Sequence, residues 1–303
     1  MESICPSLSI QVTNICNANC IFCAYQYQDG FCKARGVMSD ATYEKVLSDY
    51  KIMGGTSILF TSLVGEPLVD PKIIDRLNYA RNVGFDVGMI TNGVLLNRLD
   101  LESFLKVGLC FFMISTAPFD ETMYESIYRH RRYSDLLAGL IRLLSLRKAL
   151  GTDLCVNLAF RSQIPGKKVR TLPDFCQHIW PLLTSRERSK IIVVTNSFDD
   201  WNGQIRQKDL LEGMRLAQTP WLKLRPCAQT FQLMIQWNGQ VRACSCRFNG
   251  KESIAGDELF VGDITKKSLA EIWAGQEIRG IRRGFVRGRA PLICGDCTIY
   301  SSC

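Results

Sequence analysis

The stretch "LSIQVTNICNANCIFC", residues 8–23, runs from an apolar strand-like segment straight into three closely spaced cysteines. Cys16, Cys20 and Cys23 have the spacing Cys-x3-Cys-x2-Cys on one short loop. A structural zinc site takes four protein ligands in a closed tetrahedron. Three thiols on a loop after the first strand therefore favour a metal centre with one open position. A closed zinc site or a group of buried thiols is the alternative.

Apolar runs of β-forming residues recur before residue 205, and several are nearly continuous, as in strands buried on both faces. These runs are residues 8–14, 57–62, 85–93, 109–118, 154–163 and 190–198. Segments with helical periodicity and a terminal glycine lie between them, at 40–54, 71–84 and 133–151. Alternating strands and helices indicate parallel βαβ units. We predict an α/β fold, a partial (β/α)6 TIM-like barrel over residues 1–205, with its chemistry at the carboxyl ends of the strands.

The pattern changes after residue 205, where a small cysteine-rich domain is predicted over 206–303. Residues 231–244 read as a β-hairpin around Asn238-Gly239, a pair that favours a type I′ turn. Residues 268–285 read as one helix that begins with a capping box, in which Ser268 is the N-cap and Glu271 the third helical residue.

The composition favours sulfur-ligated metal over disulfides. The 303 residues include 14 cysteines but only two histidines, and no secretory signal or apolar run of about 18 residues is present. We therefore expect a cytoplasmic protein with reduced thiols and no membrane partner. Thiolate-only sites suit zinc or iron–sulfur clusters.

The net charge of +8 fits either a solvated basic surface or an anionic cofactor or substrate. The chain shows no basic stripe interleaved with aromatic residues and no nucleic-acid motif, so nucleic acid is not an expected partner.

The cysteine loop resembles the signature of the radical S-adenosylmethionine (SAM) superfamily, Cys-x3-Cys-x-aromatic-Cys, with Phe22 in the aromatic position. "VGEP" (64–67) resembles the family's Gly-Gly-Glu-Pro segment, which binds the amino group of SAM. The match covers Gly65, Glu66 and Pro67, and a valine stands in place of the first glycine.

Three further residues resemble SAM contacts of this family. Asn92 lies in "TNG" at the end of the third strand-like run, and Ser115 lies in "IST" at the end of the fourth. Ser115 resembles the family's serine near the ribose and carboxylate, and Arg129 resembles an arginine that pairs with that carboxylate.

The resemblance implies a 4Fe–4S cluster on Cys16, Cys20 and Cys23 whose fourth iron binds SAM. It also implies reductive cleavage of SAM to a radical that takes a hydrogen atom from a substrate. A flavodoxin- or ferredoxin-type protein is then the expected electron donor.

A second group of cysteines resembles the SPASM/twitch domains that hold auxiliary 4Fe–4S clusters, and "VGDITKKSLAEIW" (261–273) resembles the segment that links their two halves. Four thiols are enough for one auxiliary cluster, which is the favoured number. A second cluster would have to use Cys303, Cys246 and ligands that the sequence does not identify, and a zinc ribbon is the alternative. The four proposed ligands are Cys227, Cys244, Cys294 and Cys297.

Cys246, in "ACSC", has two interpretations. It is either a buried cysteine or cluster ligand, or a catalytic hydrogen-atom donor to a substrate radical, which would make the enzyme an epimerase. Without such a donor, the auxiliary cluster would accept an electron, as in a dehydrogenase.

The favoured function is a radical SAM enzyme that abstracts hydrogen from a small molecule of the carbohydrate or aminocyclitol type, leading to epimerisation or alcohol oxidation. One alternative is a peptide- or protein-modifying radical SAM enzyme, of the thioether-forming or maturase type. The other is a non-catalytic thiolate metal protein.

Overall fold

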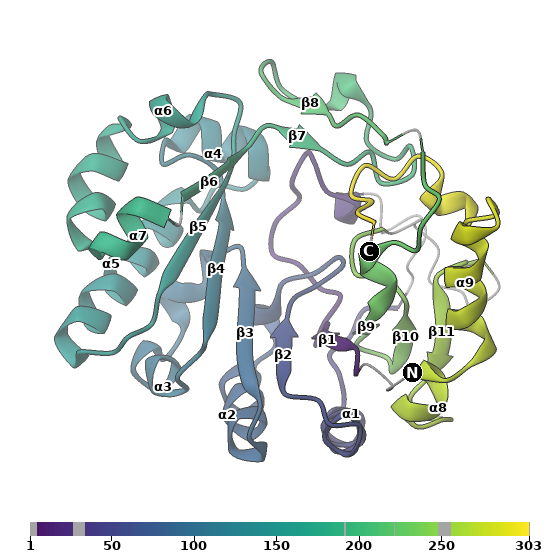
Figure 1. Ribbon diagram of the computed structural model, residues 1–303. Coiled ribbons are helices and arrows are strands. Elements are labelled where there is room, and N and C mark those ends of the chain that lie inside the picture. The colour runs from purple at the N-terminus through teal and green to yellow at the C-terminus, as the bar shows by residue number, and fades with distance from the viewer. Residues whose placement is uncertain (1–4, 27–33, 191, 221, 248–255, 303) are drawn as a thin grey trace.

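The computed structural model describes residues 5–26, 34–190, 192–220, 222–247 and 256–302. Its centre is a nine-stranded sheet with the order β11-β10-β9-β1-β2-β3-β4-β5-β6. Neighbouring strands from β1 to β6 are all parallel, which confirms the predicted α/β partial barrel (Figure 1). These strands are β1 (Ser7–Ile10), β2 (Ser57–Phe60), β3 (Asp86–Thr91), β4 (Phe111–Thr116), β5 (Val156–Arg161) and β6 (Ile192–Thr195).

Helices connect the barrel strands, as the alternating pattern predicts. The three predicted helices are present, and local signals set their ends. The Ser39 side chain caps the first of them, and Gly84 and Gly151 end the others in left-handed conformation. The α-helices of this part are α1 (Asp40–Ile52), α2 (Ile73–Val83), α3 (Leu101–Lys106), α4 (Glu121–Tyr128), α5 (Tyr133–Leu150), α6 (Gly166–Val169) and α7 (Ser185–Lys190).

Shorter helical turns complete the connections. They are η2 (Pro67–Val69), η3 (Val94–Arg98), η4 (Phe175–Ile179), η5 (Trp180–Leu182), η6 (Gln207–Asp209), η7 (Ala228–Phe231) and η8 (Leu292–Cys294).

The cysteine-rich part continues the same sheet. Strand β9 (Gln232–Ile235) runs parallel to β1, so that Leu8 lies beside Leu233 and Ile10 beside Ile235. These four side chains are all buried. Strands β10 (Gln240–Arg242) and β11 (Phe260–Asp263) extend the sheet antiparallel, and helices α8 (Leu269–Trp273) and α9 (Gln276–Val286) lie beside them.

Three sequence predictions need correction. The hairpin turn is not type I′, because only Gly239 has a positive φ (+87°), whereas type I′ also needs one at Asn238. Its Gly239 N–H donates to the Gln236 carbonyl, so a tighter turn precedes a left-handed glycine. The predicted helix over 268–285 is two helices that break before Gly275, although its capping box is present.

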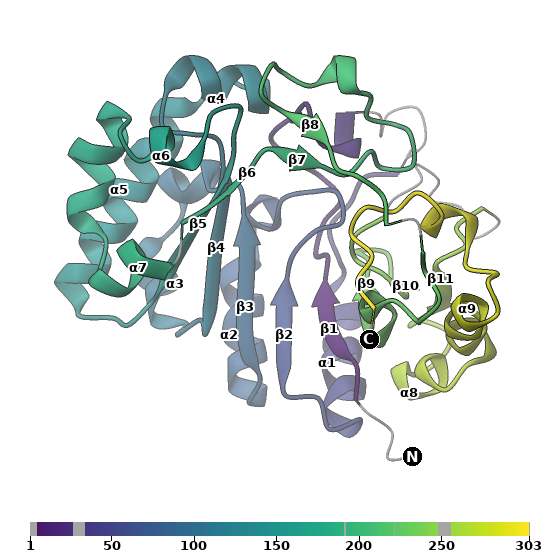
Figure 2. The ribbon, with the colours of Figure 1, turned by 45° about the horizontal axis from the view of Figure 1, so that its top comes forward.

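The third correction concerns the run 190–198. It is divided between β6 and β7 (Ser197–Phe198), and β7 pairs instead with β8 (Arg215–Leu216). This two-stranded sheet lies beyond the carboxyl ends of the barrel strands in both views (Figures 1 and 2). None of the described helices is long and apolar enough to span a bilayer.

Candidate active site with two thiol-lined cavities

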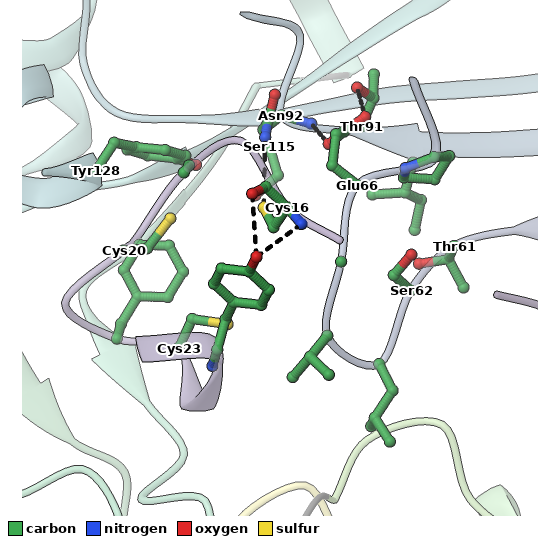
Figure 3. Close-up of a pocket in the computed structure, with 18 residues that line it drawn as sticks. Cys16, Cys20, Cys23, Thr61, Ser62, Glu66, Thr91, Asn92, Ser115 and Tyr128 are labelled. Atoms are coloured by element: carbon green, nitrogen blue, oxygen red, sulfur yellow. Dashed lines mark hydrogen bonds between the residues drawn. The ribbon is translucent and has the colours of Figure 1, made fainter. Parts of the chain in front are cut away.

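The first cavity lies at the carboxyl ends of β1 to β4 and has a volume of about 160 Å³. Cys20, Cys23 and Tyr128 lie on one side of it, and Ser62 and Glu66 lie on the other (Figure 3). Of the predicted site residues, it brings together Cys16, Cys20, Phe22, Cys23, Gly65, Glu66, Pro67, Asn92 and Ser115.

Hydrogen bonds from nearby residues and from other elements of the fold hold the cysteine loop in place. The Tyr25 hydroxyl accepts from the Cys16 N–H (3.0 Å) and donates to the Cys16 carbonyl (3.1 Å). The backbone N–H of Ile21 donates to the Ile127 carbonyl at the end of α4 (3.0 Å). Phe22 points into an aromatic group in which it stacks on Phe198, with ring centroids 5.1 Å apart. The loop geometry is therefore set both by Tyr25, near in the sequence, and by contacts far away in it.

The three thiols of this loop suit a metal centre rather than free thiolates. Burial raises the pKa of Cys16 and Cys20, and it raises the pKa of Cys23 to about 11. A bound cation would overcome this penalty, because metal coordination stabilises the thiolate. Among the described residues, no three or more His, Cys, Asp or Glu side chains converge on the position of a single metal ion. The donor set fits an iron–sulfur cluster, in which each cysteine binds a different iron.

Gly65 occupies a position that needs a glycine. Its φ is +133°, and a Cβ there would lie 2.4 Å from the Thr13 carbonyl oxygen. The next residue, Glu66, donates its backbone N–H to the Ile15 carbonyl (2.9 Å). The loop after β2 thus packs directly on the chain that leads into the cysteine loop.

The Glu66 carboxyl group is hydrogen-bonded to neighbouring loops. It accepts hydrogen bonds from the Leu68 N–H (3.0 Å), the Thr91 hydroxyl (2.5 Å) and the Asn92 N–H (2.7 Å). Burial nevertheless raises its pKa to about 7, against the opposing effect of these bonds. Asn92 in turn donates its side-chain amide to the Asn17 side chain (2.7 Å), beside Cys16. Glu66 therefore organises the cavity wall.

Arg129 lies outside this cavity. It is exposed, its φ is +51°, and its Nη1 donates to the Gln26 side chain (2.8 Å). The sequence reasoning missed Arg161, at the end of β5, whose Nε donates to the Ser115 hydroxyl (3.2 Å) and whose charge acts on Cys20. No acidic side chain of the described chain forms a salt bridge with Arg161. Its position at the carboxyl end of a strand was the available signal.

The second cavity collects the remaining thiols. Among the described residues, Cys246 lines this second cavity and does not line the first. The other cysteines that line it are Cys227, Cys244, Cys294 and Cys297, the four that the sequence analysis proposes as ligands of one auxiliary cluster. Cys303 lies outside the described residues, although its neighbour Ser302 pairs with Cys227.

Two cationic side chains lie beside this second group of thiols, and one of them, Arg247, is itself paired with three carboxylates. The Lys223 ammonium group donates to the carbonyls of Cys294 (2.6 Å) and Cys297 (3.0 Å). Arg247, which follows Cys246, is fully buried and also lines the cavity. Burial raises the pKa of Cys297 to about 11, with Arg247 opposing it, so these thiols, like those of the first cavity, fit a thiolate-ligated cluster.

Comparisons with known proteins agree with this arrangement. The model of the Radical SAM superfamily matches residues 10–158, and that of the SPASM iron–sulfur cluster-binding domain matches residues 227–298. A tungsten-containing aldehyde ferredoxin oxidoreductase cofactor-modifying protein from Pyrococcus furiosus is 23% identical, over 98% of this chain and 88% of the relative.

Two solved structures share the fold at 15% identity. BtrN in complex with AdoMet and 2-DOIA aligns over 98% of this chain and 94% of BtrN, with a TM-score of 0.57. Streptococcus suis SuiB bound to precursor peptide SuiA aligns over 99% of this chain and 72% of SuiB, with a TM-score of 0.62. The chain therefore belongs to the radical SAM superfamily, with a 4Fe–4S cluster and SAM as its cofactors, and it carries a C-terminal SPASM iron–sulfur domain.

Proposed function

We propose that this enzyme oxidises an alcohol of a small polyhydroxylated molecule, of the carbohydrate or aminocyclitol type. When bound, the first cofactor pair supplies a hydrogen-abstracting radical and the auxiliary cluster supplies an electron acceptor. The observation that carries the proposal is the location of Cys246 in the second cavity, among the auxiliary cysteines.

The position of Cys246 favours oxidation over epimerisation. Epimerisation needs a donor that returns a hydrogen atom to the substrate carbon, whereas oxidation removes a hydrogen atom, an electron and a proton. The Cys246 backbone N–H donates to the Cys244 sulfur (3.3 Å), and its thiol donates to the Gln229 side chain (3.3 Å). Its hydrogen bonds are thus made to residues of the second cavity. There its thiol would lie beside the auxiliary cluster rather than beside the substrate.

The residues of each cavity have distinct proposed roles. Cys16, Cys20 and Cys23 would ligate the first cluster, and the segment Gly65–Pro67 with Asn92 and Ser115 would hold SAM. The second cluster would be held within the predicted domain 206–303, by Cys227, Cys244, Cys294 and Cys297. The expected electron donor is a flavodoxin or ferredoxin.

The small-molecule proposal draws support from BtrN, because the alignment extends over almost all of that protein, whose structure contains AdoMet and 2-DOIA. A peptide substrate is the second candidate. It is favoured by the somewhat higher TM-score with SuiB, which was solved with a precursor peptide.

An anaerobic assay in deuterated water tests the proposal. The reconstituted protein is given SAM, a reductant and either candidate sugars and aminocyclitols or candidate peptides. We expect 5′-deoxyadenosine and a ketone product without solvent deuterium. Deuterium at one carbon, lost in Cys246→Ala, would establish epimerisation instead, and turnover of peptides alone would establish the second candidate.

Metal analysis tests the cofactor content independently of substrate. Two 4Fe–4S clusters correspond to about eight irons per chain. Zinc in place of iron, together with no cleavage of SAM under any reductant, would overturn the enzymatic proposal and leave a non-catalytic thiolate protein.

A further inference from the structure

The turn that follows β7 contacts the cysteine loop of the first cavity. The Trp201 indole N–H donates to the Phe22 carbonyl (2.9 Å), one residue before Cys23. The Phe198 ring stacks on the Phe22 ring at an interplanar angle of 20°. Trp201 and Cys23 both pack against one small apolar cluster formed by Ala24, Leu63, Val64 and Met234. Phe22, the residue before the last cysteine of the loop, is therefore held by β7 and this turn through both its backbone and its side chain.

The same turn is fastened to the second cavity. The Asp199 carboxylate accepts from the Thr298 hydroxyl (2.7 Å) and N–H (3.3 Å), directly after Cys297. It also forms an ion pair with Arg247, whose Nε donates to the Ile293 carbonyl (3.1 Å), directly before Cys294. Thus Asp199 is joined to both ends of the segment that carries two of the auxiliary cysteines.

The conformation of the turn depends on these carboxylates. Trp201 has a φ of +51°, which bulky L-residues rarely adopt, and Asn202, a residue type that tolerates this region, has a φ of +60°. Such a conformation persists only where the surroundings impose it. Here Asp199 accepts from the Trp201 N–H (2.7 Å), and Asp200 accepts from the Asn202 N–H (3.1 Å) while pairing with Arg247 (2.8 Å). Two of the three carboxylates that pair with Arg247, those of Asp199 and Asp200, therefore also hold the backbone of this turn, and the third is Asp296.

We propose that Asp199 and Trp201 are positioning residues that couple the two cavities. A cluster in the second cavity would fix the segments around Cys246 and Cys297, and with them Arg247 and Thr298. These residues hold Asp199, and the turn then holds the Trp201 indole against Phe22, so that Cys23 is placed to ligate the first cluster. Because coupling between two sites is reciprocal, a first cluster would equally favour the second.

A double-mutant cycle tests this coupling without using activity. One change is Trp201→Phe, which keeps an aromatic ring but removes the N–H donor. The other is Cys294→Ala with Cys297→Ala, which prevents loading of the second cavity. The readout is the rate at which a chelator removes iron from the first cavity of the anaerobically reconstituted protein, followed by Mössbauer or EPR spectroscopy.

Each change alone should speed the loss of first-cavity iron by at least about fivefold, the lower end of typical coupling between sites. The combined variant should lose first-cavity iron no faster than the faster of the two single changes, because both changes break the same pathway. Additive effects, or an unchanged rate in the Cys294/Cys297 variant, would overturn the proposal. Trp180→Phe is the matched control, since Trp180 packs on Phe175 and Arg188 instead and should leave the rate unchanged.

Thr298→Val keeps the test decisive where Trp201→Phe fails to fold. It removes only the hydroxyl donor to Asp199, and the same non-additivity is expected with it. The inference rests on the proposed occupancy of both cavities, so the iron content of the wild-type protein is measured first. Iron missing from either cavity would refute that occupancy. Iron in both cavities without coupling would refute only the proposed roles of Asp199 and Trp201.

Discussion

At the scale of residues, charge near the first cavity comes from a position that the family motif did not identify. Arg161 is partly buried at the end of β5, bound to Ser115 through its Nε, and has no salt-bridge partner in the described residues. A partly buried guanidinium without a counter-ion is costly, and an anionic ligand removes that cost. Arg129, by contrast, is exposed and bound to Gln26. The carboxylate of SAM is the anion that the proposed function brings to this cavity.

Two alanine variants distinguish these arginines. Arg161→Ala should weaken SAM binding by about tenfold or more, since a hydrogen bond to a charged group contributes roughly 1.5–3 kcal/mol. Arg129→Ala should change it little. The measurement is equilibrium binding of SAM to the reconstituted protein. A larger loss of SAM affinity in Arg129→Ala than in Arg161→Ala would indicate that Arg129 binds the carboxylate instead.

Glu66 predicts a pH dependence of stability in the protein without cluster or SAM. Its pKa of about 7 in the folded chain exceeds the ordinary value of 4.5. Between pH 4.5 and pH 7 the Glu66 carboxyl group is ionised in the unfolded chain but still protonated in the folded chain. The free energy of unfolding should therefore fall as pH rises from about 4.5 to about 7. The total effect is at most about 3 kcal/mol, from roughly 1.4 kcal/mol per pKa unit.

Glu66→Gln should abolish this contribution, because an amide does not titrate there. At low pH its stability should be lower than that of the wild-type protein, since the amide nitrogen cannot accept from the Asn92 N–H that now bonds to the carboxyl group. Denaturant unfolding of both proteins at several pH values measures the slope. Equal slopes would contradict the shifted pKa.

At the scale of elements, long periodic helices and the first five barrel strands were predictable, and short elements were not. Helices α3 and α4 have six and eight residues, too few turns for a periodic apolar pattern to stand out. The run 190–198 is continuous in sequence, yet Asn196 separates two strands that pair with different partners. Pairing partners are distant in the sequence, so local propensity does not identify them.

The contact between the loops after β1 and β2 can be tested at Gly65. Gly65→Ala adds a Cβ that would meet the Thr13 carbonyl, in a backbone conformation that already disfavours alanine. We expect a loss of about 2–5 kcal/mol in unfolding free energy, together with weaker retention of first-cavity iron.

Gly54→Ala is the matched control for this substitution. Gly54 has φ +82° but open space around its Cβ position, so only the conformational cost of about 1–2 kcal/mol applies. Thermal or denaturant unfolding compares the two variants. Equal losses would mean that the contact with Thr13 does not constrain the site.

At the scale of the whole molecule, the two predicted domains share one sheet. Strand β9 pairs with β1 along four residues, and the Leu269 N–H at the start of α8 donates to the Asp49 carboxylate in α1 (3.0 Å). A shared sheet with a common buried core should unfold as one cooperative unit. The cysteine loop follows β1 directly, so it depends on both parts.

Leu233→Ala tests this cooperativity. Leu233 is fully buried in β9, and its truncation should cost about 2–5 kcal/mol. We expect faster hydrogen exchange not only around β9 but also in peptides from β3 and β4, in the other predicted domain. Leu222→Ala, at a side chain that is 51% exposed, is the control and should leave exchange unchanged. Effects confined to residues beyond 205 would show two independent units.

The order of the βα units, the cysteine loop after the first strand and the capping box at Ser268 could be read from local patterns in the chain. These features depend on spacing, periodicity and capping, which act within a few residues. Three features became visible only in the folded chain: β9 lies beside β1, Cys246 lines the second cavity, and the turn around Trp201 contacts both Phe22 and Thr298. Those outcomes depend on which distant segments share a buried surface, and no local pattern in the chain encodes that pairing.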